Sequence, residues 1–236
     1  SSVSTSCRAA EPGDVITRFG TADVRTWEEH ESPYERVAQG LKDRGVAAGR
    51  LGIEETVRHM FSDGIAQAVP ALKLVSGTPV TAGCRVVKDQ HELALMKIAS
   101  AVTLKAYEAA WQALKEGMTQ DDFQGLVAAA HDKLGYPGGA SVQTAEFSAL
   151  PHGSIQPQVI REGTIILIDG GCSVEGYVSD ISRTFVLGKA TDKMKAVFDI
   201  EFAAQTAALK AARPGVPCEA VDAAARKVIE DGGYGP

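Results

Sequence analysis

Two aspartates in the second half of the chain have the type and spacing of a metal-binding pair. Asp169 follows the apolar, β-branched run Ile165–Ile168, and Asp180 lies eleven residues further on. Gly170 and Gly171 follow the first aspartate, so we expect its strand to end there in a turn. In a hairpin the two carboxylates would face each other across adjacent strands, where they repel unless a cation lies between them. The pair therefore favours a divalent cation such as Mn²⁺, Mg²⁺ or Zn²⁺.

A role in a turn is the alternative for both aspartates, because Asp beside Gly is common in hairpins. The apolar run before Asp169 favours the metal site, since it predicts that this carboxylate is partly buried. A buried carboxylate needs a partner, and a cation is one.

A histidine is the third candidate. His152 stands between Pro151 and Gly153 after a passage rich in small residues, which predicts an exposed and rigidly held imidazole. On its own this pattern is also typical of a surface histidine without a function. The remaining histidines lie in helical or charged surroundings and indicate no role: His30, His59, His91 and His131.

The elements that would hold these residues follow from the apolar periodicity. Helices are expected at 91–115, 120–134, 192–212 and 219–230. Thr119 and Thr191 are suitable N-caps for two of them. Strands are expected at 164–169, 176–180 and 182–187. The Gly/Ser/Pro-rich passage 135–157 is too polar and too broken for a regular helix.

Before Gly83 the pattern is different, with short apolar runs separated by turn residues. They predict a helix at 34–44 and strands at 51–53 and 72–75, and a further apolar run lies at 15–19. Alternating short strands and helices indicate an α/β region, although a sparse one.

Composition limits the classes of function. The 236 residues are 44% hydrophobic, which is enough for a substantial core, and the formal charge of −6 includes no basic stripe for a nucleic acid. No apolar run approaches the roughly 18 residues of a membrane span, and the first ten residues lack the apolar centre of a signal peptide. Four cysteines without a C-x-x-C pair favour reduced thiols and a cytoplasmic protein.

Several short motifs recur in a fixed order along the second part of the chain. They are Leu150–Gly153, Arg161–Gly171, Gly176–Tyr177 and Ser179–Phe185, with supporting matches at Gly135–Tyr136, Arg213–Gly215, Glu219–Asp222 and Gly233–Gly235. In order and spacing they resemble the prolidase and aminopeptidase P branch of the creatinase-like pita-bread metallopeptidases. The resemblance covers residues 85–236, and residues 14–80 are weakly similar to the latter part of the family's N-terminal domain.

The resemblance implies an α+β fold in two parts. Residues 1–84 would be part of a smaller creatinase-type N-terminal α/β domain, and residues 85–236 the N-terminal portion of a pita-bread catalytic domain. Asp169 matches the family aspartate that chelates one metal ion, and Asp180 the one that bridges two. His152 matches a catalytic histidine that lines the substrate pocket, and Ser182 is expected to orient the bridging carboxylate.

The function implied by the resemblance is hydrolysis of the Xaa-Pro bond, in dipeptides or at peptide N-termini. The nucleophile would be a hydroxide shared by two divalent metal ions, with Mn²⁺ preferred over Zn²⁺ or Co²⁺. The expected partners are a proline-containing peptide and a second copy of the chain in a homodimer, with no nucleic acid and no membrane.

Three rival functions exist within the same fold. A creatinase-like hydrolase acts on a guanidino compound without metal, and a non-catalytic binding module has lost its ligands; the presence of Asp169 and Asp180 disfavours both. A methionine aminopeptidase shares the aspartates but has no N-terminal domain, whereas residues 14–80 suggest one here.

The resemblance also predicts how this chain behaves alone. The family's other ligands, a histidine and two glutamates, belong to segments that follow a Gly-Tyr-Gly such as Gly233–Gly235, and the chain ends at Pro236. Two carboxylates leave a hard cation well short of six ligands. We expect the purified chain to bind Mn²⁺ weakly and not to hydrolyse Gly-Pro; robust release of proline in an amino-acid assay would contradict this.

Overall fold

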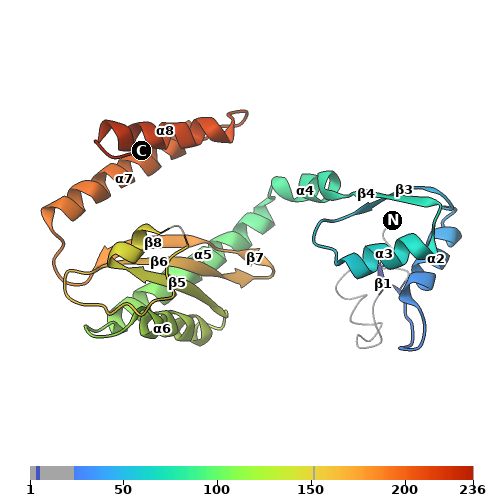
Figure 1. The fold of residues 1–236 in the computed structure, drawn as a ribbon, viewed down its shortest axis with the longest axis horizontal. Helices are drawn as coiled ribbons and strands as arrows, with labels where there is room; N and C mark the ends of the chain where they lie inside the picture. Colours follow the sequence, from blue (N-terminus) through green and yellow to red (C-terminus); the bar gives the residue numbers. More distant parts are fainter. Residues whose placement is uncertain (1–3, 6–23, 151, 236) are drawn as a thin grey trace. The chain divides into compact units, whose positions relative to one another are not determined.

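The computed structural model describes residues 4–5, 24–150 and 152–235. The chain divides into two compact units, Ser1–Lys88 and Asp89–Pro236 (Figure 1). The apolar run expected at 15–19 lies outside the described residues. Assignment of residues 1–84 to a creatinase-type domain stays a prediction.

The first unit alternates short strands with helices, as expected. Its elements are β1 (Ser4–Thr5), β2 (Val24–Arg25), α2 (Pro33–Asp43), β3 (Gly49–Ile53), α3 (His59–Ala68), β4 (Leu72–Ser76) and α4 (Thr78–Val86). β1 pairs with β2 and β3 with β4, both in parallel, so α3 is the crossover that a parallel pair requires. The helix and two strands expected here are confirmed, whereas α3 and α4 were not expected.

The second unit is an antiparallel sheet with helices. Its elements are α5 (Gln90–Ala113), α6 (Gln120–Lys133), β5 (Gly138–Thr144), the 3₁₀ turn η1 (Ala145–Ala149), β6 (Ile165–Val174), β7 (Tyr177–Val178), β8 (Ile181–Val186), α7 (Asp192–Ala211) and α8 (Cys218–Asp231). β6 is central, with β5 on one side and both β7 and β8 on the other (Figure 1). The four expected helices are confirmed, and side chains of Thr119 and Thr191 cap α6 and α7.

The core lies between the sheet and the helices α5 and α6. Ile166 and Ile168 of β6 are buried and pack against Phe123 of α6, which is fully buried. Phe123 also meets the ring of Phe185 edge-on, with ring centroids 6.1 Å apart. The buried side chains alternate along β6, so one face of the strand is sealed and the other is left to solvent.

The strand that carries Asp169 is longer than expected. A turn at Gly170–Gly171 was predicted, and this is wrong: β6 continues to Val174, and the chain reverses at Glu175–Gly176, both at positive φ (49° and 84°). The glycine pair stays extended because Gly170 has ladder partners on both sides, in β5 and in β8. Strand β5 itself was not expected, since Gly and Ser have low strand propensity and only the pairing with β6 recruits them.

The helices α7 and α8 pack against each other and show several large apolar side chains to solvent. Phe198 is 54% exposed and Phe202 61%.

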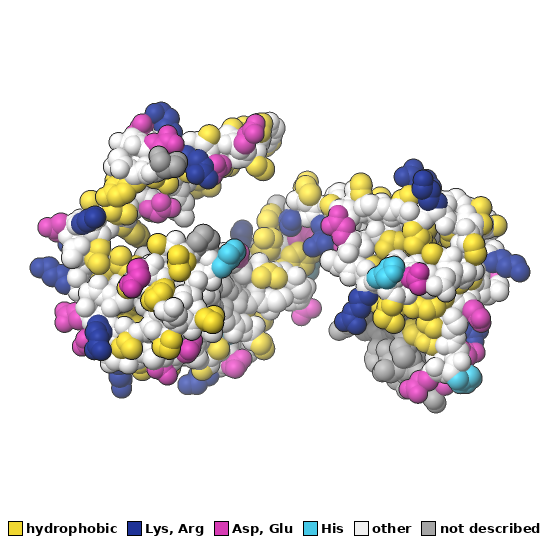
Figure 2. Space-filling view, viewed as in Figure 1, with side chains coloured by type: hydrophobic (Ala, Val, Ile, Leu, Met, Phe, Trp, Pro, Cys, Tyr) yellow, Lys and Arg dark blue, Asp and Glu magenta, His cyan; other side chains and the backbone are white. Residues whose placement is uncertain are grey.

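On the visible face, lysine, arginine and acidic side chains are interspersed rather than segregated (Figure 2). None of the helices within the described part of the chain has the length and apolarity to cross a membrane.

The aromatic core gives a testable prediction. Phe123→Ala removes a fully buried ring and should lower the free energy of unfolding of the second unit by about 3–5 kcal/mol, because the cavity collapses only in part. In a Trp27→Phe background Trp111 is the one tryptophan of the chain. Its ring centroid lies 4.5 Å from that of Phe185, so its fluorescence reports on this core. Urea denaturation followed by Trp111 fluorescence measures the loss. Phe202→Ala is the control, with an expected change within roughly 0.5 kcal/mol; equal effects would show that the core is placed wrongly.

Candidate active site

The register of β6 places both aspartates on one face of the hairpin. Ser182 is paired with Asp169, and β6 meets β7 and β8 in the same register. The backbone N–H of Ser179 donates to the carbonyl of Cys172 at 3.0 Å, which continues this register between the two strands. Asp180 therefore lies level with Gly171, diagonally across from Asp169. Such diagonal neighbours are roughly 7–8 Å apart, so two carboxylates there are within reach of one cation.

Close approach of the strands depends on Gly171. A Cβ at this position would lie 1.9 Å from the carbonyl oxygen of Ser179, which real Cβ atoms do not tolerate. A side chain on Gly171 would therefore push the Asp180 segment away from β6. Gly171 thus serves strand pairing, where the sequence suggested a turn.

Asp169 is exposed, so the expected partial burial of its carboxylate is wrong. The reason is alternation: Ile168 faces the helices, and the next residue of the strand faces the other way. The hydroxyl of Ser182 donates to Oδ1 of Asp169 at 2.5 Å. Ser182 was expected to orient Asp180, and in the structure the carboxylate that it holds is that of Asp169.

His152 is exposed and lies with Asp169 on the wall of one hollow of about 250 Å³. The hollow is lined by Ser141, Gln143, Leu150, His152, Gly153, Leu167 and Asp169. The structure thus brings His152 and Asp169 to one hollow, and it places Asp180 on the strand face that carries Asp169.

Three glutamines hold the loop of His152, and the sequence did not point to them: Gln120 and Gln158 are buried, and Gln143 is half-buried. Oε1 of Gln143 accepts from the backbone N–H of Ser154 and from Nε2 of Gln158, both at 2.8 Å. The N–H of Gln158, whose residue is 3% exposed, donates to Oε1 of Gln120 on α6 at 2.6 Å. Because these amides bond one another, the pocket loop is tied to both β5 and α6.

A buried tyrosine packs behind the hairpin that carries Asp169 and Asp180, and its pKa is raised in part by both carboxylates. Tyr107 of α5 is 5% exposed, and its hydroxyl donates to the carbonyl of Ile181 at 2.9 Å. Burial, together with the negative charges of Asp169 and Asp180, raises the pKa of Tyr107 to about 12. Both aspartates are therefore close enough to Tyr107 of α5 for their negative charges to act on its hydroxyl.

The donor set fits part of a site for a divalent metal ion. Carboxylate oxygens suit hard and borderline cations, and the hydroxyl of Ser182 orients the carboxylate of Asp169. Within the described residues no third His, Cys, Asp or Glu joins the pair closely enough to hold a metal ion.

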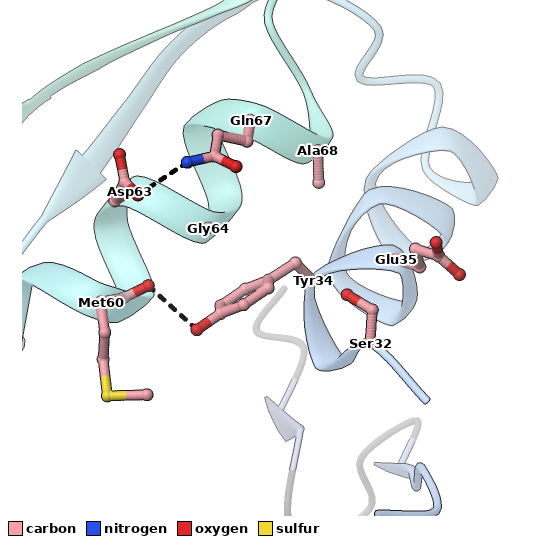
Figure 3. Close-up of a pocket in the computed structure, with 8 residues that line it drawn as sticks. All are labelled: Ser32, Tyr34, Glu35, Met60, Asp63, Gly64, Gln67 and Ala68. Atoms are coloured by element: carbon pink, nitrogen blue, oxygen red, sulfur yellow. Dashed lines mark hydrogen bonds between the residues drawn. The ribbon is translucent and has the colours of Figure 1, made fainter. Parts of the chain in front are cut away.

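A second, larger hollow belongs to the first unit and has a different character. It measures about 420 Å³ between α2 and α3 and is lined by Ser32, Tyr34, Glu35, Met60, Asp63, Gly64, Gln67 and Ala68 (Figure 3). Tyr34 donates to the carbonyl of Met60 at 2.9 Å, and Gln67 donates to Asp63 at 2.7 Å. Since these polar groups bond one another instead of converging on the hollow, it makes a poor ligand site.

Comparison with known proteins identifies the fold and the family. The solved structure of a dipeptidase from Pyrococcus horikoshii OT3 has a TM-score of 0.84 at 28% identity and covers 95% of this chain and 63% of that one. Residues 94–236 match the model of metallopeptidase family M24. The chain belongs to this family, and it has part of the family's pita-bread fold, preceded by part of a smaller α/β domain.

Curated relatives extend over nearly the whole chain. The putative dipeptidase YkvY of Bacillus subtilis (strain 168) is 28% identical over 233 residues, which cover 97% of this chain and 64% of that protein. An Xaa-Pro dipeptidase of Lactobacillus delbrueckii subsp. lactis is 29% identical over 243 residues, with the same two coverages. The chain thus spans about 64% of the length of these relatives. Membership of a metallopeptidase family implies a divalent metal cofactor.

Burial of Tyr107, together with the nearby carboxylates, predicts that the stability of the fold depends on pH. An unfolded tyrosine has a pKa of about 10, and that of Tyr107 in the folded chain is about 12. Below pH 10 both states keep the proton, so no stability is lost. Between pH 10 and about 12 the unfolded state releases it first, so the free energy of unfolding falls as pH rises.

Urea denaturation at several pH values from 9 to 11 measures this fall. Wild type should lose stability more steeply above pH 10 than Tyr107→Phe, which has no proton to release at this position. Parallel profiles for the two proteins would mean that the pKa of Tyr107 is ordinary.

Proposed function

We propose that this chain carries the metal-binding strands and the substrate-pocket histidine of an Xaa-Pro peptidase. The observation that carries the proposal is the open face of the β6–β8 hairpin, where Asp169, Asp180 and Ser182 stand together next to the hollow of His152. Two further points support it: the chain belongs to a metallopeptidase family, and an aligned relative is named Xaa-Pro dipeptidase.

The two aspartates would contribute ligands to a pair of divalent metal ions, with Asp169 on one ion and Asp180 between the two. Ions so bound would supply a water of lowered pKa as the nucleophile. All-oxygen donors at these positions favour Mn²⁺ over Zn²⁺ or Co²⁺. Ser182 keeps one oxygen of Asp169 occupied as an acceptor, which leaves the other oxygen free to point toward a cation.

His152 would hydrogen-bond the peptide at the scissile carbonyl and stabilise the negative charge that develops there. It is exposed on the wall of the hollow and is anchored by a loop that the glutamine side chains fix. A preorganised donor of this kind adds to the rate because it need not reorient during the reaction.

The chemistry of proline accounts for a dedicated pocket. An Xaa-Pro bond has no N–H, so a peptidase that grips this group cannot recognise it, and recognition must rely on the ring. Leu150 and Leu167 give the hollow two apolar walls that suit a pyrrolidine ring. Hydrolysis of dipeptides and removal of N-terminal residues from longer peptides both fit such a pocket. A homodimer and a cytoplasmic location belong to the same proposal.

The function is tested with the protein made from the complete reading frame that contains these residues, supplied with Mn²⁺. We expect hydrolysis of Gly-Pro but not of Gly-Gly. Because even groups that only support a ligand are worth roughly 10–100-fold, Asp180→Asn should lower kcat/KM by at least about a hundredfold. Asp199→Asn, on an exposed position of α7, is the matched control and should leave kcat/KM unchanged.

The outcomes separate the rival functions. Turnover of Gly-Pro that survives in Asp180→Asn would rule out the metal role of that residue. Metal-independent hydrolysis of a guanidino compound would indicate a creatinase-like hydrolase, and peptide binding without turnover a non-catalytic module. Parallel assays with Gly-Pro and with a longer peptide of the type Xaa-Pro-Xaa distinguish a dipeptidase from an aminopeptidase.

A further inference from the structure

The helix behind the metal-binding face holds the two residues that flank Asp180. Thr103 and Tyr107 stand one turn apart on α5, so their side chains lie on the same side of the helix. Oγ1 of Thr103 is 2.8 Å from Oγ of Ser179, and the hydroxyl of Tyr107 donates to the carbonyl of Ile181 at 2.9 Å. One turn of α5 therefore forms hydrogen bonds with the residue immediately before Asp180 and with the residue immediately after it.

These hydrogen bonds are buried, so water cannot replace either partner. Thr103 is fully buried, Ser179 is 4% exposed and Tyr107 is 5% exposed. A hydroxyl at such a position has no water to turn to if its partner moves, so each bond fixes its segment strongly. Oγ of Ser179 also accepts the backbone N–H of Cys172 at 3.0 Å, which ties the same residue to β6.

A buried histidine extends these contacts into the next helix. Nδ1 of His131 lies 3.0 Å from the carbonyl oxygen of Val127, and Nε2 lies 3.5 Å from Oγ1 of Thr103. Since Oγ1 of Thr103 is also 2.8 Å from Oγ of Ser179, a chain of hydrogen-bonding groups connects the hairpin through α5 to α6.

Because successive side chains point to opposite faces, fixing the neighbours of Asp180 also fixes the direction of its side chain. Ser179 faces the helix, so the next residue must face away from it, toward the side that carries Asp169. With both neighbours fixed, the backbone at Asp180 has little freedom to rotate its carboxylate off that face.

We propose that Thr103 and Tyr107 are positioning residues that aim the carboxylate of Asp180 at the metal site. This rests on the proposed function, in which Asp180 is a metal ligand. Neither residue touches the metal or the substrate; both act through the backbone and side chain of the 179–181 segment.

The test measures Mn²⁺ affinity of the 236-residue chain, with free Mn²⁺ followed by EPR and bound Mn²⁺ by water-proton relaxation. Thr103→Val and Tyr107→Phe each remove one hydroxyl with little change of shape. Each should weaken binding about tenfold, the usual loss when a group that orients a ligand is removed. Thr103→Ser keeps the hydroxyl and should restore the wild-type affinity.

Tyr177→Phe is the matched control. Its hydroxyl donates to Glu92 at 2.8 Å and so also ties this hairpin to α5, but near the turn and not beside Asp180. It should leave Mn²⁺ affinity unchanged although it removes a contact of the same kind. Loss of affinity in Tyr177→Phe equal to that in Tyr107→Phe would overturn the inference, because any loosening of the hairpin would then suffice.

A double-mutant cycle separates positioning from general stability. In the Asp180→Asn background, Tyr107→Phe should cause no further loss of affinity, since it acts through a carboxylate that is no longer there. Full additivity would overturn the inference. Wild-type affinity in Thr103→Val and Tyr107→Phe would also overturn it while leaving the proposed function intact. If Asp180→Asn itself binds as wild type does, the metal role of Asp180 fails and this inference fails with it.

Discussion

The antiparallel pairing of β6 with the chain that returns from the turn at Glu175–Gly176 is the constraint on which the site depends. A shift of this register by one residue would send Asp180 to the helix side and Ser179 to the open side. Two features keep the register in place. The hydrogen bonds between Ser179 and Cys172 bridge the gap between β7 and β8, and the absent side chain of Gly171 lets the backbones approach.

The same pairing divides the work between two faces of the sheet. On one face Ile166 and Ile168 seal the core against α5 and α6, which stiffens β6 along its length. On the other face the carboxylates and Ser182 stay open to solvent, where a cation and a peptide have access. Adjacent residues of one strand point to opposite faces, so packing that immobilises Ile168 also immobilises the backbone of Asp169.

Local pattern predicted much of this arrangement, and long-range contacts decided the rest. Helices such as α6 follow from periodicity and an N-cap, both of which lie within a few residues. Strand β5 was missed because its Gly- and Ser-rich residues gain strand structure only by pairing with β6. The burial of Asp169 was misjudged because four consecutive apolar residues precede it, although Ile165 and Leu167 lie on the open face and are only half-buried. Motif resemblance singled out His152, Asp169 and Asp180. The polar groups behind them, which join residues 69 to 76 positions apart, have no local signal.

Stability alone does not explain those polar groups. A buried hydrogen bond contributes only about 1 kcal/mol net, and an apolar pair of the same shape in place of Thr103 and Ser179 would pack about as well. What an apolar pair lacks is direction, because dispersion contacts hold a strand against a helix without fixing its rotation. A hydroxyl pair on one side of Asp180 and a tyrosine on the carbonyl of the next residue fix that rotation. Their placement at this one point of α5 is therefore better explained by the orientation of a carboxylate than by the cohesion of the core.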